Sequence, residues 1–388
     1  MENVKISDVL KKYTMTIALV VVVIFFSVTT KGTILYPQNI NNLISQNAYV
    51  FVLAVGMLLC ILTGGNIDLA VGSVVCFVGA IGGSMMDKNV NIWVSVIAML
   101  VVGVLIGVWH GFWIAYINVP PFIATLAGMY AFRGLSNVVL NGLTVTIDDK
   151  TFLNVFGGGD ACYIPDFIGG KINMTCMLAG IAAIVIFLFV TIKGRIDTKK
   201  HGYETKPLAG DVAKMVVISA VVLWVTYKLS QYKGIPTALV WILVVVLVYG
   251  YITQKTRIGR YLYAVGGNKK AAQLSGVNVK NVYFFAYVNM GVLAAFAGIL
   301  TVARACMAQP TFGQGYEMDA IGSCFIGGAS AYGGIGTVPG VIIGAVLMGV
   351  INQGMSIMGI GADMQKVVKG VVLLLAVIFD VVSKNEKK

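Results

Sequence analysis

The stretch NIWVSVIAMLVVGVLIGVWHGFWIAYI, residues 91–117, contains no Asp, Glu, Lys or Arg. It is long enough to cross the hydrocarbon core of a bilayer, which takes about 20 apolar residues in a helix. Because backbone polar groups must be satisfied inside lipid, such a segment is expected to be helical. Similar segments recur along the chain at about 13–30, 40–63, 68–86, 91–117, 120–139, 173–192, 214–230, 235–252, 282–302, 320–335, 338–358 and 365–383.

The composition agrees with a membrane protein. Hydrophobic residues make up 58% of the chain and charged residues only 11%, whereas a soluble domain usually carries about 25% charged residues. The net charge of +12 does not indicate nucleic-acid binding, because the basic residues sit in short loops between apolar runs. A positive-inside bias at the membrane explains them better.

The sequence therefore predicts an all-α, polytopic transmembrane helix bundle that occupies residues 1–388 as a single domain. The segment 320–335 is short and rich in glycine, so it is expected to be a broken or re-entrant helix. We accordingly expect about 10–12 spans, some of them interrupted by Gly-rich breaks.

The distribution of charge predicts the orientation. Basic residues gather in the N-terminus, the loops 193–214 and 253–281, and the C-terminus, and twelve crossings place all four regions on one side. The positive-inside rule makes that side cytoplasmic, so both termini are expected inside. The longest loop on the other side, about 140–172, is the more acidic one, with Asp148, Asp149, Asp160 and Asp166.

No site for ATP is recognisable in the chain. A phosphate-binding loop needs G-x-x-x-x-G-K-[S/T], and the Gly170–Lys171 pair lacks the upstream glycine and the following Ser or Thr. A gradient-driven carrier would need ionisable groups within its spans. The candidates singled out are Asp68, His110 and Arg133, with His110 read as either a packed histidine or a proton relay. Energy is therefore expected to come from a partner.

A first glycine-rich motif, TGGNIDLAVGS at 63–73, lies between two apolar helices. Glycine breaks at membrane depth are tolerated where they line a cavity or are buried in protein. Asp68 could cap the following helix. Alternatively, Asn66, Asp68 and Ser73 could face a polar solute, and both roles can hold together.

A second motif, GGASAYGGIGTVPG at 327–340, is another break followed by a helix of small residues, and it contains Ser330. Two broken segments in opposite halves of a transporter often belong to an internal repeat around the path. The likeness between the two motifs is one of composition only.

The third motif lies in the basic loop and reads TRIGRYLYAVGGNKKAAQLSGV at 256–277. Residues 268–275 are predicted to form a short helix, with Asn268 as N-cap and Gly276 as a left-handed C-cap. Its small residues Ala271, Ala272 and Ser275 could fit the groove of a soluble partner. The alternative is a solvated basic loop at the lipid headgroups.

Together these three motifs resemble those of the ribose/galactose/xylose-type ABC importer permeases, and the resemblance covers nearly the whole chain. It includes PFIATL at 121–126, Arg133–Gly134 and YEMDAI at 316–321. This chain departs from typical ribose-type members by an insertion of a basic loop and about two spans at roughly 193–252. The longer architecture is similar to the xylose and multiple-monosaccharide branch.

The resemblance implies a permease homodimer in the cell (inner) membrane, a cytoplasmic ABC ATPase that uses the ATP, and an extracytoplasmic sugar-binding protein. It implies neither an enzyme nor a bound cofactor. The expected ATPase-coupling residues within loop 253–281 are Gly267, Asn268, Ala271, Ala272, Ser275 and Gly276. The candidates for the substrate path are Asn66, Asp68, Ser73, Phe122, Thr125, Asp319 and Ser330. The alternatives left open are a gradient-driven secondary sugar carrier and a membrane enzyme that uses Asp68 and His110.

Overall fold

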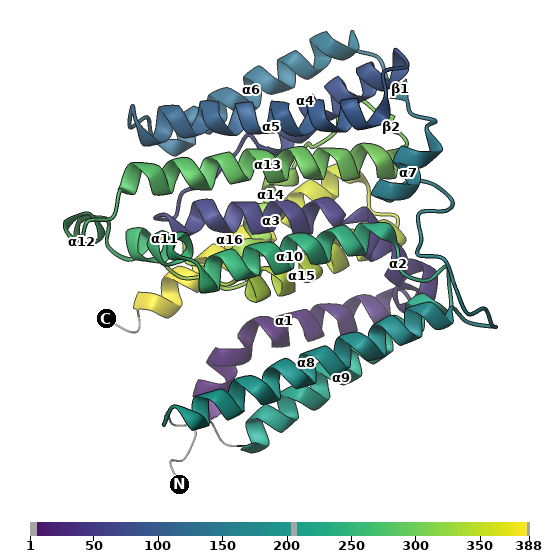
Figure 1. The fold of residues 1–388 in the computed structure, drawn as a ribbon, viewed down its shortest axis with the longest axis vertical. Helices are drawn as coiled ribbons and strands as arrows, with labels where there is room; N and C mark the ends of the chain where they lie inside the picture. Colours follow the sequence, from purple (N-terminus) through teal and green to yellow (C-terminus); the bar gives the residue numbers. More distant parts are fainter. Residues whose placement is uncertain (1–5, 203–207, 386–388) are drawn as a thin grey trace.

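The computed structural model describes residues 6–202 and 208–385; the basic residues Lys5, Lys206, Lys387 and Lys388 lie outside them. Helices account for nearly all of the regular structure (Figure 1). In chain order the elements are α1 (Ile6–Thr29), η1 (Thr33–Leu35), α2 (Pro37–Gln46), α3 (Ala48–Leu62), α4 (Val71–Asp87), α5 (Ile92–Ala115), α6 (Pro121–Leu140), β1 (Val145–Thr146), α7 (Lys150–Phe156), α8 (Met174–Lys200), α9 (Leu208–Ser230), α10 (Thr237–Lys255), α11 (Arg257–Gly267), α12 (Lys269–Leu274), α13 (Val279–Ala305), β2 (Met307–Ala308), α14 (Tyr316–Ile326), α15 (Val338–Ile357) and α16 (Ala362–Asn385).

The predicted apolar segments all fall on helices, which confirms an all-α, polytopic membrane bundle. Two of them are broken. The segment 40–63 divides at Asn47 into α2 and α3, which are bent by 43°. The segment 320–335 is helical only as far as Ile326, where α14 gives way to the second glycine-rich motif. The eleven residues of α14 reach only about 16 Å at 1.5 Å per residue, about half the thickness of the hydrocarbon core.

Within the described residues, seven helices are long and apolar enough to cross a membrane, or eight if the bent α2–α3 pair counts as one span. These seven are α5, α6, α8, α9, α10, α13 and α15. The other apolar segments lie on α1, α4, α14 and α16, which run alongside them (Figure 1). The apolar part of α1 (Met15–Thr29), α4 and α14 are shorter than the other spans, and α16 carries charged residues.

The core forms around α13, which packs against α3, α4 and α5, while α3 also packs against α14 and α15. Glycines allow α5 and α13 to approach closely: a Cβ on Gly107 would lie 2.8 Å from the carbonyl oxygen of Tyr287, and one on Gly291 would lie 2.7 Å from the amide nitrogen of Gly107. Such contacts substitute for the hydrophobic effect, which does not drive helices together inside lipid. Gly103, Gly107 and Gly111, spaced four residues apart on α5, therefore serve helix packing.

The helices α8 and α9 form a pair that stands apart from this core. They pack mainly on each other, with Gly180 against Thr226, and α9 also contacts α2. By contrast, α10 packs against α3, α11 and α15 in the body of the bundle. The helices that pack as a separate pair are therefore α8 and α9. Of the two helices expected in the insertion 193–252, α9 belongs to this pair and α10 belongs to the core.

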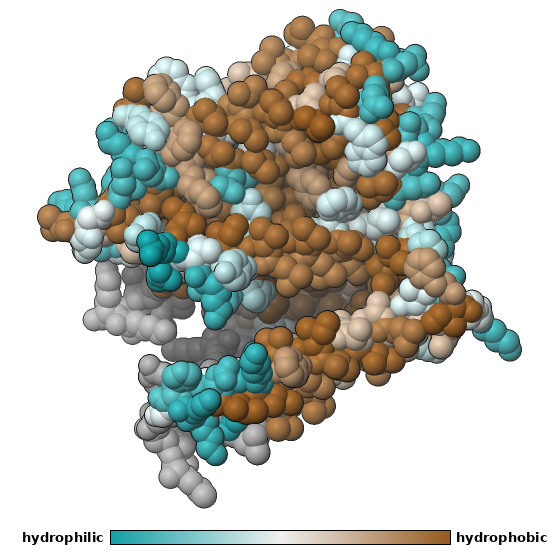
Figure 2. Space-filling model, viewed as in Figure 1, coloured by the Kyte–Doolittle hydropathy of each residue, from teal (hydrophilic) through white to brown (hydrophobic). Residues whose placement is uncertain are grey.

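The bundle has two hydrophilic ends and an apolar middle. Figure 2 shows a broad hydrophobic band with hydrophilic residues at both ends. One end carries α11, α12, the start of α1 and the end of α16 (Figure 1). The opposite end carries α2, α7 and the two-stranded sheet, in which Val145 pairs with Ala308 and Thr146 with Met307. The loops 253–281 and 140–172 thus lie at opposite ends, as predicted.

Candidate substrate path and coupling site

The first glycine-rich motif connects α3 to α4 through a turn that only glycine adopts easily. Gly64 and Gly65 have φ angles of +132° and +75°, in the region that penalises a Cβ. Asp68, only 3% exposed, accepts a hydrogen bond at 2.8 Å from the N–H of Ala70, the residue before α4. Its carboxylate thus holds the turn that leads into the helix, but Asp68 lies two residues before the N-cap, Ala70, and does not cap the helix as predicted.

Asn66 faces a different environment from Asp68. It lines a cavity of about 660 Å³ together with Asn118 and Pro121 from the α5–α6 connection and Lys269 and Tyr283 from the α12–α13 region. Its side-chain amide donates to the hydroxyl of Thr63 at 3.1 Å. Asn66 therefore lies at the end of the bundle that carries the basic loop.

The remaining candidates from the first half do not join this cavity. Ser73 is buried, and its hydroxyl has no partner among the described residues. Thr125 is buried and donates to the carbonyl of Pro121 within its own helix, while Phe122 is 54% exposed on the surface of α6. His110 is buried among Trp109 and Phe132. The structure therefore disperses the predicted path residues of this half.

Asp319 lies in a buried polar group that joins three helices. Its Oδ2 accepts a hydrogen bond at 2.7 Å from the hydroxyl of Tyr49 on α3 and one at 2.9 Å from the ammonium of Lys369 on α16. The aromatic ring of Tyr49 stacks on that of Tyr316, with centroids 3.5 Å apart. An ion pair inside a membrane helix bundle is costly to bury and commonly functional.

Sequence reasoning did not single out Lys369 or Tyr49. The segment 365–383 is apolar on average, and that average hides two lysines, Lys366 and Lys369. A lysine within a span is itself a signal, since it needs a partner inside the bundle. That rule would have identified Lys369, and the buried Asp319 would then have been a natural partner.

Ser330 holds the turn within the second glycine-rich motif. Its N–H donates to the carbonyl of Ile335 at 2.9 Å, and its hydroxyl accepts from the N–H of Tyr332 at 3.1 Å. The neighbouring N–H of Ala331 donates to the carboxylate of Asp380 on α16 at 3.1 Å. Ser330 is thus a buried structural residue of the break. The break is bonded to α16, the helix that also carries Lys369, the partner of Asp319.

The three glycine-rich motifs meet at one place. The N–H of Gly334 donates to the carbonyl of Leu62 at 3.1 Å. A Cβ on Gly333 would lie 2.7 Å from the amide nitrogen of Gly65, and one on Gly334 would lie 2.7 Å from that of Gly267. Tyr263 on α11 adds a hydrogen bond at 2.8 Å to the carbonyl of Gly336. The basic loop is therefore in direct backbone contact with both breaks of the bundle.

The third motif forms the predicted short helix. Asn268 caps α12 by accepting from the N–H of Ala271 at 3.0 Å, and Gly276 adopts a left-handed φ of +84° just after the helix. Ala271 and Ser275 are exposed, as are Gly267, Asn268 and Gly276.

The prediction that Ala272 belongs to an open face for a partner is wrong. It is 6% exposed because α12 rests on α11 and α13 and turns Ala272 toward the bundle. The exposed apolar residue is instead Leu274, at 90%. The face of α12 that is open to solvent is therefore formed by Ala271, Leu274 and Ser275.

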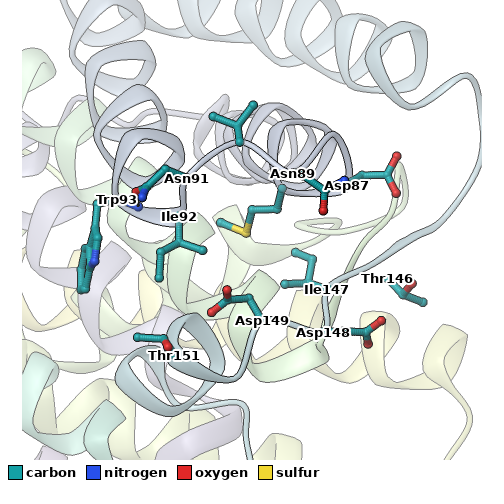
Figure 3. Close-up of a pocket in the computed structure, with 12 residues that line it drawn as sticks. Asp87, Asn89, Asn91, Ile92, Trp93, Thr146, Ile147, Asp148, Asp149 and Thr151 are labelled. Carbon is teal, nitrogen blue, oxygen red and sulfur yellow. Dashed lines mark hydrogen bonds between the residues drawn. The ribbon is translucent and has the colours of Figure 1, made fainter.

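The opposite end of the molecule carries a polar pocket of about 680 Å³ between the end of α4, the start of α5 and the β1–α7 connection. Figure 3 shows Asp149 between Ile92 and Ile147, with Asp87 and Asp148 on the side away from Trp93. Asp149 caps α7 through the N–H of Phe152, and Asn91 caps α5 through the N–H of Trp93, both at 2.9 Å. These polar groups therefore have structural roles at the helix ends.

Asp166, in the same long loop, anchors the start of α8. Desolvation of its carboxyl is outweighed by hydrogen bonds from the hydroxyl and N–H of Thr175 and from the N–H groups of Ile168 and Met174, which lower the pKa of Asp166 to about 2. The carboxylate is therefore ionised at any physiological pH. These local hydrogen bonds tie the end of the loop to the start of α8, while Ile147, Phe152 and Phe156 earlier in the loop are buried in the core.

Comparison with known proteins agrees with this architecture. The chain is 38% identical over 385 residues to the xylose transport system permease protein XylH of Haemophilus influenzae, covering 98% of both chains. It is 34% identical to XylH of Escherichia coli K12, covering 97% of this chain and 93% of that protein. It is also 34% identical to the ribose import permease protein RbsC of the same strain, covering 94% and 92%. No solved structure matches the chain.

The fold and these similarities define a multi-pass membrane permease. More particularly, residues 39–377 match the family described as branched-chain amino acid transport system / permease component, and the chain belongs to that family.

Proposed function

We propose that this protein is the membrane subunit of an ATP-driven importer and forms the path for a monosaccharide, with xylose as the first substrate to test. The observation that carries the proposal is the 38% identity to a xylose transport permease over 98% of both chains. A neutral, hydroxyl-rich solute also suits a bundle whose breaks offer Asn, Ser, Tyr and backbone groups.

The contact between the three glycine-rich motifs supports coupling through the basic loop. A cytoplasmic ABC ATPase would bind the exposed face of α12, formed by Ala271, Leu274 and Ser275. Movement of α12 would reach the breaks directly, because Gly267 contacts Gly334 and the N–H of Gly334 is bonded to Leu62. The ATP is used by the partner, and this chain needs no cofactor for its part.

The orientation follows from the same assignment. The end with α11, α12 and both described chain ends would be cytoplasmic, and the end with α7 and the β1–β2 sheet would receive sugar from an extracytoplasmic binding protein. We expect a homodimer in the inner membrane, with this chain acting as a permease and not as an enzyme. A gradient-driven secondary carrier is the competing function.

Uptake in cells tests the proposal. Cells would carry this gene with those of its expected ATPase and binding protein, and labelled xylose uptake would be compared with that of cells whose ATPase lacks its phosphate-binding lysine. We expect uptake to require the intact ATPase. Uptake that persists with the inactive ATPase and stops on collapse of the proton gradient would identify a secondary carrier.

A further inference from the structure

A small cavity of about 150 Å³ lies where the α2–α3 bend meets the end of α13 and the start of α14. Side chains from all these elements line it, including Gln46, Tyr49, Thr301, Arg304, Phe312 and Tyr316. A water molecule takes about 30 Å³ in the liquid, so the cavity has room for about five waters. That is the size of one sugar ring, and none of the path candidates taken from the sequence lines it.

One wall of the cavity is aromatic and rigid. The rings of Tyr49 and Tyr316 are stacked at an interplanar angle of 12°. The hydroxyl of Tyr49 is fixed by Asp319, which is paired in turn with Lys369. A flat ring held in this way can pack against the C–H face of a sugar without a further loss of side-chain freedom, which favours binding.

The other wall carries side chains that can form hydrogen bonds with a ligand. Arg304 is half-buried and donates to the side-chain oxygen of Asn42 at 3.5 Å; within the described residues it has no carboxylate partner. Thr301 donates its hydroxyl to the carbonyl of Ala297 at 2.8 Å, and its oxygen has two acceptor lone pairs, of which the neighbouring Tyr316 hydroxyl can use one. Gln46 is exposed and offers both a donor and an acceptor.

We propose that this cavity is a subsite for a neutral monosaccharide on the outer half of the path, with the sugar ring against the tyrosine wall and its hydroxyls on Arg304, Thr301 and Gln46. The subsite rests on the proposed function. It lies toward the end that carries α2, α7 and the sheet, because α13 leads from the cavity directly into β2. Asp319 and Lys369 act here as positioning residues through Tyr49.

Uptake by the complete importer provides the first test. Arg304→Gln and Gln46→Ala change exposed or half-buried side chains, so the fold should be retained. Arg304→Gln should lower xylose uptake at limiting sugar about tenfold, the effect of losing a hydrogen bond from a charged donor. The matched control is Gln231→Ala, an exposed glutamine at the end of α9 outside the cavity, which should leave uptake unchanged.

Direct binding provides the second test. In a permease whose native cysteines are replaced, Gln46→Cys would be labelled by a maleimide in detergent, with and without xylose. Xylose should slow labelling several-fold and leave labelling of Gln231→Cys unchanged. Protection by xylonic acid but not by xylose would replace the neutral sugar with an acidic one.

The two proposals fail in different ways. No protection by either compound, together with uptake by Arg304→Gln within twofold of wild type, would overturn the subsite while leaving the permease function intact. Absence of monosaccharide uptake by the wild-type importer would instead overturn the proposed function itself.

Discussion

The ammonium of Lys369 on α16 donates a hydrogen bond at 2.9 Å to Oδ2 of Asp319 on α14, a carboxylate with no exposed surface. The same oxygen binds the hydroxyl of Tyr49, while Oδ1 has no partner among the described residues. Through this pair the short helix α14, which precedes the second break, is tied to the C-terminal helix.

Removal of one member of this pair should destabilise the permease. Lys369→Met leaves the carboxylate of Asp319 buried without its counter-charge, which typically costs about 3–5 kcal/mol. The double variant Asp319→Asn with Lys369→Met should lose less than the sum of the two single variants, because both charges are absent. Chemical unfolding in detergent would measure this, and a loss below about 0.5 kcal/mol for Lys369→Met would show that the pair is not needed.

The contact between the three motifs predicts that two glycines with similar φ angles differ in the effect of substitution by alanine. Gly334 and Gly359 have φ angles of +69° and +72°. A Cβ on Gly334 would meet the backbone of Gly267, whereas one on Gly359 would meet no atom of the described residues within 4 Å. Gly359→Ala should cost about 1 kcal/mol from backbone strain alone. Gly334→Ala should cost clearly more and also abolish uptake. Equal stability and equal uptake of the two variants would exclude a close backbone contact at Gly334.

Asp68 can be tested by a change that keeps its hydrogen bond. Asn can accept from the N–H of Ala70 almost as well as Asp, so a purely structural Asp68 predicts near-normal uptake in Asp68→Asn. A carboxylate that contacts the substrate predicts reduced uptake with normal assembly in the membrane. We expect the first result, since the observed contact of the carboxylate is with the backbone.

The exposed face of α12 predicts where an ATPase binds. Leu274→Glu should weaken co-purification of the ATPase and lower uptake, because a charge in a packed contact would be desolvated. The control is Leu143→Glu, an exposed leucine in the loop 140–172 at the other end of the bundle. Ala272→Glu should instead reduce the stability of the permease itself, since Ala272 is buried against α11 and α13. Wild-type ATPase yield with Leu274→Glu would remove α12 from the proposed interface.

Sidedness can be measured with an impermeant thiol reagent in a cysteine-free background. A cysteine in place of Asp160 should react in intact cells, and one in place of Leu274 only after permeabilisation. Both side chains are exposed at opposite ends of the bundle, so access to the residue itself is not limiting. The reverse pattern would invert the predicted orientation.

The fold could be predicted largely from the sequence because lipid leaves few choices for a long apolar segment. The caps of α12 were also predictable, since Asn268 and Gly276 act locally. The orientation of Ala272 was not, because it depends on which side of a short helix rests on α13. The separation of Asn66 from Asp68, two residues apart, has the same origin: tertiary packing directs neighbouring side chains of a loop to different surroundings.

Reconstitution tests the central claim most directly. The permease would be placed in proteoliposomes with its ATPase, with the binding protein and labelled xylose on the outer side and ATP on the side of α12. The account predicts xylose accumulation that requires ATP, the ATPase and the binding protein, and none for the permease alone under a proton or sodium gradient. Gradient-driven xylose accumulation by the permease alone would contradict it.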